Sequence, residues 1–384
     1  MTARAGLPGL ADHPGKSEDW CGHGEDAGMV MNGSGCARAD GAAESDVLSS
    51  RWTPLPLADV LALVEERYGL SGTLDRLSSE RDETFKITVA NGRSYTLKIA
   101  NPAENPDILR FQNDVLRHLA AAAPAVPVPR LVPDRDGEES FCLNGAGGAP
   151  RIVRLLTYLD GDLLRGMPGS IARNRNLGHA LAVLGLGLRS FERRPPGGKL
   201  LWDISHSLDL APLVRHVAPE RRPFVLAALD AFARSVPGVA PGLRHQLIHN
   251  DFNPHNIVID PADPDRIAGI IDFGDMVHAP LVNDLAVALA YHLSGEDWTA
   301  LCGAIVEGYQ AVAPLEPQEI ALLPILVRSR LAMTVVITEW RAASRPEDKD
   351  YILRNHKSAW IGLQRLSGPA GDAFRRLLSD KSEA

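Results

Sequence analysis

Two short polar segments near the middle of the chain carry residue types that suit phosphoryl transfer. The first, HNDFNPHN, spans His249–Asn256, and the second, IIDFGD, spans Ile270–Asp275. Transfer to a hydroxyl needs a carboxylate that orients the hydroxyl and accepts its proton, together with oxygen ligands that hold Mg²⁺ against the phosphates. Asp251 suits the first task because it lies in a loop directly after a short apolar strand. Asn256 and Asp272 offer the amide and carboxylate oxygens for the second.

The same chemistry needs a cation that meets the phosphates from another direction. Lys98 is the sole lysine on an otherwise apolar strand, Ser94–Ala100. That placement indicates a buried charge with a phosphate partner. The competing interpretation is a lysine at a strand end whose ammonium reaches solvent.

Neighbouring polar residues also have structural interpretations. We expect the ring of His249 to brace the loop by hydrogen bonds rather than to transfer a proton. Asp284 is first interpreted as a helix N-cap, with Asn283 competing for that position, and it also suits a brace beneath the loop. Two roles remain open for Asp275: it assists the metal or a substrate ammonium, or it caps a turn.

The pattern along the chain predicts an α+β protein with two lobes that position these residues. We expect a β-rich lobe over residues 51–157, which holds the nucleotide, and a mostly helical catalytic lobe over residues 158–370, with a hinge at Asp160-Gly161. The first lobe is predicted to contain helices at 56–68 and 107–123, a three-stranded meander at 74–77, 84–89 and 94–100, a strand pair near 131–133 and 139–143, and a strand at 151–158. Helices are predicted at 171–191, 208–216, 223–235, 284–293, 298–312, 317–344 and 348–366, with short strands within 246–275.

The two ends of the chain are predicted to lie outside these lobes. Residues 1–50 are rich in Gly, Ala, Asp and Glu and almost lack Leu, Ile and Phe. Such a segment buries too little apolar surface to offset the entropy of ordering, so we expect it to be disordered. Residues 371–384 are expected to form a C-terminal tail.

Composition excludes several classes of protein. The net charge of −8 argues against a nucleic-acid partner, because binding phosphate backbones needs clustered Lys and Arg. We find no run of 18 or more apolar residues and expect no membrane span. The four cysteines, which are far apart, indicate free thiols in a reducing cytoplasm rather than a disulfide framework or a zinc knuckle.

Taken together and in this order, the motifs resemble the aminoglycoside phosphotransferase and choline kinase superfamily. Its HxDxxxxN loop matches His249, Asp251 and Asn256, its IDF/W segment matches 271–273, and its strand-borne lysine matches Lys98. The resemblance covers residues 55–366 and implies a fold similar to that of protein kinases. It also implies Mg²⁺ and either ATP or GTP as phosphoryl donor.

The resemblance further assigns the nucleotide contacts. The turn at 79–85 would lie over the triphosphate, with Ser79, Thr84 and backbone amides around the phosphates, and the strand from Leu156 to Tyr158 would meet the base. One departure concerns Lys98, which commonly pairs with a glutamate on the first-lobe helix in kinases. The corresponding helix segment is RFQNDV, so we expect Gln112 as its partner, with Asp114 as the alternative.

A narrower resemblance concerns the acceptor. The segments LSSERDETF (77–85), VRLLTY (153–158), WD (202–203) and IDFGDM (271–276) resemble hydroxylysine kinases and kinase domains fused to class-III aminotransferases. This implies an amino-alcohol or hydroxy-amino-acid acceptor, foremost 5-hydroxylysine, and favours GTP. Homoserine, choline, ethanolamine and aminoglycosides are the alternatives.

An amine acceptor needs anionic or aromatic partners, and an amino acid also needs a cation for its carboxylate. Candidates for the ammonium are Trp202, Asp203, Asp275 and Trp340, although the tryptophans suit a helical core equally well. Candidates for the carboxylate are Arg328, Arg330 and Arg341, among which the sequence does not choose.

Two other classes of function remain open. His245, His249, Asp251 and His255 could serve a metal-dependent hydrolase, although their spacing is irregular for zinc and this leaves Lys98 and Asn256 unexplained. A catalytically dead nucleotide-binding module is the other, kept open by the missing helix glutamate.

Overall fold

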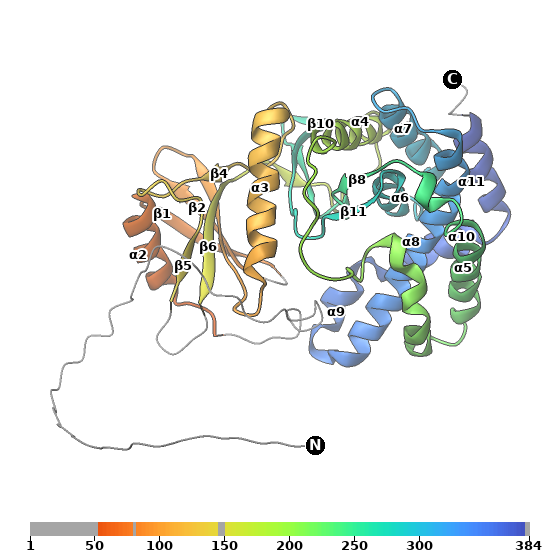
Figure 1. The fold of residues 1–384 in the computed structure, drawn as a ribbon, viewed down its shortest axis with the longest axis horizontal. Helices are drawn as coiled ribbons and strands as arrows, with labels where there is room; N and C mark the ends of the chain where they lie inside the picture. Colours follow the sequence, from red (N-terminus) through yellow and green to blue (C-terminus); the bar gives the residue numbers. More distant parts are fainter. Residues whose placement is uncertain (1–52, 80–81, 145–149, 381–384) are drawn as a thin grey trace, which may run out of the picture.

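The computed structural model describes residues 53–79, 82–144 and 150–380. The expectation of disorder for residues 1–50 therefore lies outside the described residues. The described chain forms a β-rich lobe followed by a larger helical lobe, with the long helix α3 (Pro106–Ala122) between them (Figure 1).

The sheet of the first lobe is antiparallel. Its strands follow the order β1 (Gly72–Leu77), β2 (Glu83–Val89), β3 (Ser94–Ile99), β6 (Arg151–Thr157) and β4 (Leu131–Val132), and β5 (Phe141–Leu143) also pairs with β6. The predicted three-stranded meander is confirmed, and Gly92 in its second turn has a φ of 81°. The prediction that the segments near 131–133 and 139–143 pair with each other is wrong. Both pair with β6, at different ends of that strand, because its seven residues offer room for two short neighbours on one edge.

The two faces of this sheet have different compositions. On one face, alternate apolar residues of β2, β3 and β6 pack with Val60, Leu63 and Val64 of α2 (Leu57–Tyr68) into a separate core. Because side chains alternate along a strand, Thr84, Lys98 and Arg154 lie on the opposite face. The strand register places these last three directly opposite one another on neighbouring strands.

Helix α3 links the two lobes. Asn105 caps its N-terminus by accepting a hydrogen bond of 2.9 Å from the backbone N–H of Asp107, and Pro106 occupies the first turn, where no N–H is needed. Its apolar residues Phe111, Val115, Leu116 and Leu119 belong to the same core as the helical lobe. The helix is thus fixed against the catalytic lobe while its other side chains can reach the sheet.

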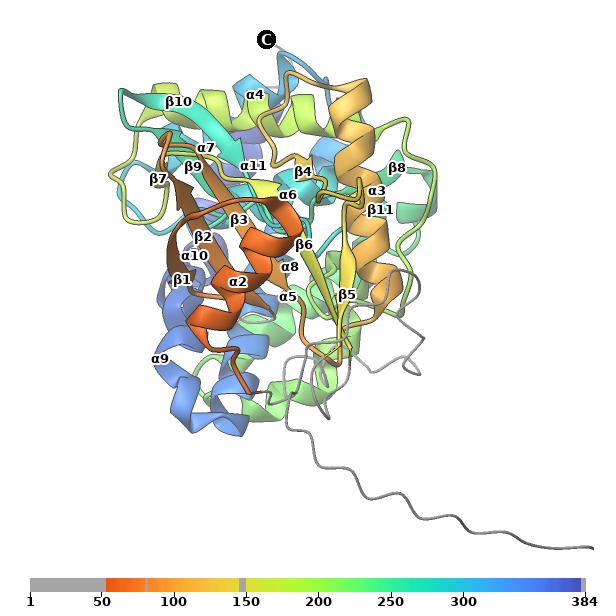
Figure 2. The same ribbon diagram turned by 90° about the vertical axis from the view of Figure 1, so that its left-hand side faces the viewer.

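The second lobe consists of helices around two small β-structures (Figures 1 and 2). Its helices are α4 (Ile171–Leu188), η1 (Ile204–His216), α5 (Arg222–Ser235), η2 (Ala240–Gly242), α6 (Val282–Ala290), α7 (Trp298–Gln310), α8 (Pro317–Ser344), η3 (Pro346–Asp348), α9 (Lys349–Ile352), η4 (Leu353–Asn355), α10 (His356–Leu366) and α11 (Pro369–Asp380). The strands are β7 (Asp162–Leu163), β8 (His245–Ile248), β9 (Ile257–Asp260), β10 (Asp263–Ile270) and β11 (Val277–Pro280). They form a sheet ordered β10-β9-β7 and a separate pair, β11-β8.

The end of the chain differs from the sequence prediction in two places. The single helix expected over 348–366 is broken into η3, α9, η4 and α10. The C-terminal tail expected from residue 371 is instead helix α11 up to Asp380. Phe374 and Leu378 of α11 are buried in the helical core, and this apolar contact explains why the segment folds against the lobe.

The structure bears on two expectations drawn from composition. Helix α8 is long and apolar enough to cross a membrane, although 78% of its most apolar window is buried inside the protein. Burial on nearly all sides accounts for that composition in a core helix. Cys302 is a free, buried thiol as expected, but Cys142 on β5 is disulfide-bonded, so the expectation of four free thiols is wrong.

Candidate active site

The loop predicted to be catalytic, called the catalytic loop below, runs from β8 to β9 and contains Asp251. The strand pairing sets what lies beside it: Ile270 at the end of β10 pairs with Ile257, and the backbone N–H of Ile271 donates to the carbonyl of Asn256 at 2.9 Å. Asp272 therefore leaves its strand next to Asn256, although the two are 16 positions apart in the sequence.

Asp251 and Asn256 are joined directly. The side-chain amide nitrogen of Asn256 donates to Asp251 Oδ2 at 2.7 Å and to the Asp251 carbonyl at 2.9 Å. With its nitrogen engaged, Asn256 keeps its amide oxygen for another partner. A hard oxygen beside the exposed carboxylate of Asp272 is the donor type that Mg²⁺ takes in proteins, so these residues fit the expected metal.

The electrostatic surroundings of Asp251 raise its pKa. Burial is the main cause, and the negative charges of Asp275 and Asp272 act in the same direction, while Arg330 acts against them; the resulting pKa is about 7. Without a bound cation, this carboxyl therefore holds its proton more tightly than an ordinary aspartate. A cation bound nearby favours the carboxylate that a proton acceptor requires.

The loop is braced from beneath by buried groups. His249 Nε2 lies 3.1 Å from the carbonyl oxygen of Ile271, and its Nδ1 accepts from the backbone N–H of Asp251 at 3.3 Å. Asp284 accepts from the backbone N–H groups of His249 and Asn250. Since α6 begins at Val282 after Leu281, Asp284 does not cap that helix.

Asn250 and Asp272 both have left-handed backbones, with φ of 63° and 66°. Such angles are uncommon for residues other than glycine, although Asn and Asp tolerate them best. Asp272 Oδ1 accepts from the N–H of Gly274 at 3.3 Å, and the side chain of Asn250 donates to the carbonyl of Asp275 at 3.1 Å. The first contact lies within the second motif, and the second holds that motif against the first.

The partner of Lys98 differs from the sequence prediction. Its ammonium lies 3.4 Å from the carboxylate of Asp82, on the turn before β2. Gln112, the expected partner, instead accepts a hydrogen bond from Arg154. Asp114, the alternative, pairs at the surface with Arg117 and Arg193. Both predictions for the Lys98 partner are therefore wrong. Arg154 on β6, whose side chain is longer than that of lysine, binds Gln112 on α3 instead.

The remaining nucleotide candidates lie around the sheet face that carries Lys98. Thr84 is directly opposite Lys98, and its buried hydroxyl oxygen lacks a hydrogen-bond partner within the described residues. Ser79 is exposed and accepts from the N–H of Asp82 at 3.3 Å. The turn residues 80–81 lie outside the described residues.

The predicted base-contacting strand joins the two lobes. Leu156 on β6 is paired with both Thr96 and Leu131. Tyr158 donates its backbone N–H to Ser94 at 3.2 Å, and Lys86 lies over its ring. A nucleotide base would thus meet other backbone groups of this segment than the N–H of Tyr158.

Among the three arginines left open, Arg330 is the one at the catalytic loop. It is buried, donates to the Trp202 carbonyl at 2.6 Å and to Asp251 Oδ1 at 3.4 Å, and lies 5.0 Å from the Trp202 ring centroid. Its contacts position Asp251 and occupy one face of Trp202. For Arg328, by contrast, burial and the positive charge of Arg375 on α11 lower the pKa.

The other substrate candidates are placed less centrally. Asp203 is buried and caps η1 by accepting from the N–H of Ser205 at 2.8 Å. Trp340 and Arg341 lie ten and eleven residues beyond Arg330 on α8, which is about 15 Å along a helix. The structure does not bring these two together with Asp251.

The histidines of the hydrolase alternative point to separate partners. His245 stacks on His278, His249 contacts Ile271, and His255 Nε2 lies 3.3 Å from Asn355 Oδ1. In the described part of the chain, no group of three His, Cys, Asp or Glu side chains could hold a metal ion. The three histidines are therefore not brought together as one ligand set in the described residues.

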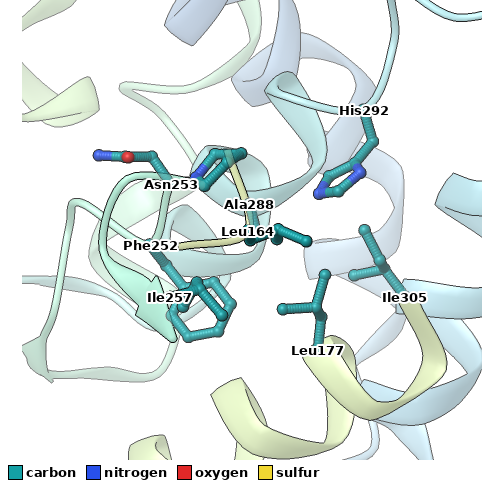
Figure 3. Close-up of a pocket in the computed structure, with 9 residues that line it drawn as sticks. Leu164, Leu177, Phe252, Asn253, Ile257, Ala288, His292 and Ile305 are labelled. Atoms are coloured by element: carbon teal, nitrogen blue, oxygen red, sulfur yellow. The ribbon is translucent and has the colours of Figure 1, made fainter. Parts of the chain in front are cut away.

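A small cavity lies behind the catalytic loop (Figure 3). Phe252 and Asn253 of the loop line it together with Leu177 of α4, Ile305 of α7 and His292, which lies between α6 and α7. Burial, with a smaller effect of Arg173, lowers the pKa of His292 to about 4, so the ring is neutral at pH 7. The lining of the cavity is mostly apolar, so the cavity belongs to the packing that supports the loop.

Sequence reasoning missed Asp82 and Arg154. Arg154 is a lone charge in an otherwise apolar run, the same signal that identified Lys98. Asp82 gave no signal beyond that of a turn residue.

The comparisons with known proteins agree with this geometry. The phosphotransferase enzyme family matches residues 73–323. Hydroxylysine kinase from Mus musculus is 27% identical over 332 residues, covering 80% of this chain and 88% of the relative. Homoserine kinase from Rhizobium etli is 30% identical over 229 residues, covering 57% of this chain and 65% of the relative.

Solved kinase structures share the fold. A microcompartment-associated aminopropanol kinase superposes with a TM-score of 0.66 at 20% identity, covering 83% of this chain and 99% of the other. A spectinomycin phosphotransferase in complex with ADP and spectinomycin superposes with a TM-score of 0.60 at 13% identity, covering 86% and 100%. The predicted α+β fold of the protein-kinase type is confirmed. The chain belongs to the phosphotransferase enzyme family and is a kinase that uses a nucleotide to phosphorylate an alcohol group.

Proposed function

We propose that this kinase phosphorylates a hydroxyl of a small amino alcohol or hydroxy-amino acid, foremost 5-hydroxylysine, with Mg²⁺ and GTP or ATP. The observation that carries the proposal is the similarity to hydroxylysine kinase, which extends over 80% of this chain and therefore over both lobes. Fold alone would not support a substrate, because related folds accept many.

The proposed roles follow from the contacts of each residue. Asp251, held by Asn256 on one oxygen and by Arg330 on the other, orients the acceptor hydroxyl and takes its proton. Asn256 and Asp272 hold Mg²⁺, which when bound neutralises charge on the transferred phosphoryl group. Lys98 exchanges Asp82 for a phosphate. The hydroxyl of Thr84, which has no hydrogen-bond partner among the described residues, lies opposite Lys98 on the same sheet face.

The charge around Asp251 favours a cationic acceptor. Burial is the main cause of the raised pKa of Asp251, and the negative charges of Asp275 and Asp272 add to it. An ammonium group on the acceptor would offset this excess of negative charge. We assign Asp275 as the carboxylate nearest such an ammonium, and we leave Trp202 and Asp203 as structural neighbours because Arg330 and the η1 N-terminus engage them.

Homoserine is the second candidate acceptor. Its support is the 30% identity to homoserine kinase from Rhizobium etli, which covers only 57% of this chain. It shares with 5-hydroxylysine an ammonium, a carboxylate and a hydroxyl, so the same site chemistry would serve both.

A phosphorylation screen tests the proposal. Purified chain is incubated with Mg²⁺ and either γ-labelled GTP or ATP against 5-hydroxylysine, lysine, homoserine, 1-amino-2-propanol, ethanolamine, choline and an aminoglycoside. The expected result is transfer to 5-hydroxylysine with the highest kcat/KM, none to lysine, which lacks the hydroxyl, and loss of transfer with excess EDTA. A higher kcat/KM for choline or the aminoglycoside would contradict the proposed acceptor.

A further inference from the structure

Arg154 is a buried cation on the sheet face that carries Lys98. It is 4% exposed, and the β3–β6 register pairs it directly with Lys98. Directly opposite residues of an antiparallel pair have Cβ atoms about 4.5–5.5 Å apart and point to the same face. Two basic side chains therefore leave the sheet side by side, toward α3 and the catalytic lobe.

The hydrogen-bond partners of Arg154 are neutral. Its guanidinium donates to Asn113 Oδ1 at 2.9 Å and to Gln112 Oε1, both on α3. These amides satisfy donors and tie the helix to the sheet, but because they are neutral they do not themselves compensate the positive charge. A buried charge is costly to desolvate, so an anion bound near Arg154 would be stabilised by it.

The charge of Arg154 interacts with carboxylates of the proposed nucleotide site. Burial lowers the pKa of the Arg154 guanidinium, while the charges of Asp82, Asp272 and Glu104 raise it. Asp82 is the partner of Lys98, and Asp272 is the proposed metal ligand. Arg154 therefore lies within electrostatic reach of the place where metal and phosphates would bind.

We propose that Arg154 is a positioning residue with two tasks: it fixes α3 to the sheet in place of a lysine–glutamate ion pair, and its charge stabilises the nucleotide triphosphate beside Lys98. This inference rests on the proposed nucleotide site. Amide partners on α3 serve both tasks, because they hold the guanidinium without neutralising it. A glutamate on α3 would hold it and remove its net charge.

This reasoning separates the proposal from a purely structural role. Gln112→Glu keeps an acceptor for Arg154 and adds the compensating negative charge, so it retains or strengthens the α3 anchor. If Arg154 only anchors the helix, Gln112→Glu leaves nucleotide affinity unchanged. If its charge acts on the phosphates, the variant binds triphosphate more weakly.

The test is calorimetric titration of the full chain with Mg²⁺-GTP, Mg²⁺-ATP and the unphosphorylated nucleosides, for wild type, Gln112→Glu, Arg154→Lys and Lys98→Met. We expect Gln112→Glu to weaken triphosphate binding about tenfold, the scale of one charge acting across several ångströms of protein. Its melting temperature should equal or exceed that of wild type, and nucleoside affinity should not change. Arg154→Lys, which keeps the charge but loses the paired amide contacts, should lower the melting temperature with a smaller loss of affinity.

Triphosphate binding by Gln112→Glu as tight as that of wild type would overturn the inference, and so would an equal loss of nucleoside binding. A wild-type chain that binds neither Mg²⁺-nucleotide would instead overturn the proposed nucleotide site, and this inference with it. Lys98→Met is the comparison, because removal of the cation proposed to contact the phosphates should weaken triphosphate binding and leave the nucleosides unaffected.

Discussion

Asp284 accepts a 2.7 Å hydrogen bond from the backbone N–H of Asn250, the residue directly before the proposed catalytic base. Its second oxygen accepts from the N–H of His249 at 3.0 Å. Asn250 has the left-handed φ of 63°, which costs free energy unless surrounding contacts fix it. A buried carboxylate on α6 thus holds the turn that directly precedes Asp251.

Asp284→Asn should therefore impair catalysis more than nucleotide binding. An amide offers one acceptor oxygen and turns an NH₂ group toward the other backbone N–H, so one buried donor loses its partner, at a cost of about 1–3 kcal/mol. We expect a lower melting temperature and a lower kcat with a nearly unchanged Kd for nucleotide. The control is Asp230→Asn, an exposed partner of Arg234 on α5.

Wild-type kcat in Asp284→Asn, together with wild-type stability, would show that the loop does not depend on this carboxylate. A parallel loss of kcat in Asp230→Asn would point to a general effect of removing surface charge.

Asp272→Ala should weaken binding of the Mg²⁺-nucleotide complex. Asp272 follows β10 beside Asn256, and its carboxylate is exposed. Asn256 keeps an amide oxygen for a metal. Loss of a charged ligand should raise the Mg²⁺ concentration needed for half-maximal activity by at least about tenfold, whereas binding of metal-free nucleotide in EDTA should not weaken. Titration of activity with Mg²⁺ measures this, and an unchanged midpoint would exclude Asp272 as a ligand.

Gly178→Ala should destabilise the helical lobe. A Cβ atom at Gly178 would lie 1.9 Å from the carbonyl oxygen of Ile305, where α4 and α7 cross. The backbones would have to separate, which costs about 1–3 kcal/mol in a packed core. Gly185→Ala on the same helix is the matched control, because its nearest neighbour would be Leu281 Cδ1 at an ordinary 3.6 Å. Equal free energies of unfolding for the two variants in urea would contradict the close crossing.

Glu339 should contribute stability that is lost in acid. Burial alone would raise its pKa, but hydrogen bonds from His356, the backbone N–H of Ala218 and Arg221 outweigh burial and lower the pKa to about 2. A depressed pKa means that the folded protein holds the proton less tightly than the unfolded chain. The contribution is therefore present above the ordinary value of 4.5 and is lost as pH falls from 4.5 toward 2.

Glu339→Gln tests that pH dependence. The melting temperature of the variant should fall below that of wild type at pH 7, and the difference should shrink at pH 3. A difference of the same size at both pH values would show that the carboxylate charge does not contribute.

The sequence predicted those features that depend on local pattern. Apolar alternation located the meander, and the offsets among Asp251, Asn256 and Asp272 placed all three at one pair of adjacent loops. Side-chain choice across space was not predictable. Gln112 was expected to bind Lys98. It binds Arg154 instead, which lies 56 positions after Lys98 in the sequence.

The same distinction explains the errors at the C-terminus. The segment after residue 371 has few apolar residues, so nothing local indicated that Phe374 and Leu378 would find the core. Arg330 was one of three equivalent arginines in the sequence. Only the packing of α8 against the catalytic loop shows that it is the one that contacts Asp251.

The central proposal is that Asp251 is the proton-accepting carboxylate of a metal-dependent kinase. Its most direct test compares wild type with Asp251→Asn in single-turnover phosphorylation of 5-hydroxylysine at saturating Mg²⁺-GTP or Mg²⁺-ATP. The nucleotide Kd is measured in parallel. The asparagine keeps the shape of the side chain but cannot accept the proton. We predict a rate at least about 100-fold lower, on the scale of general-base catalysis, with a nucleotide Kd within a few-fold of wild type. A single-turnover rate equal to that of wild type would contradict the role of Asp251.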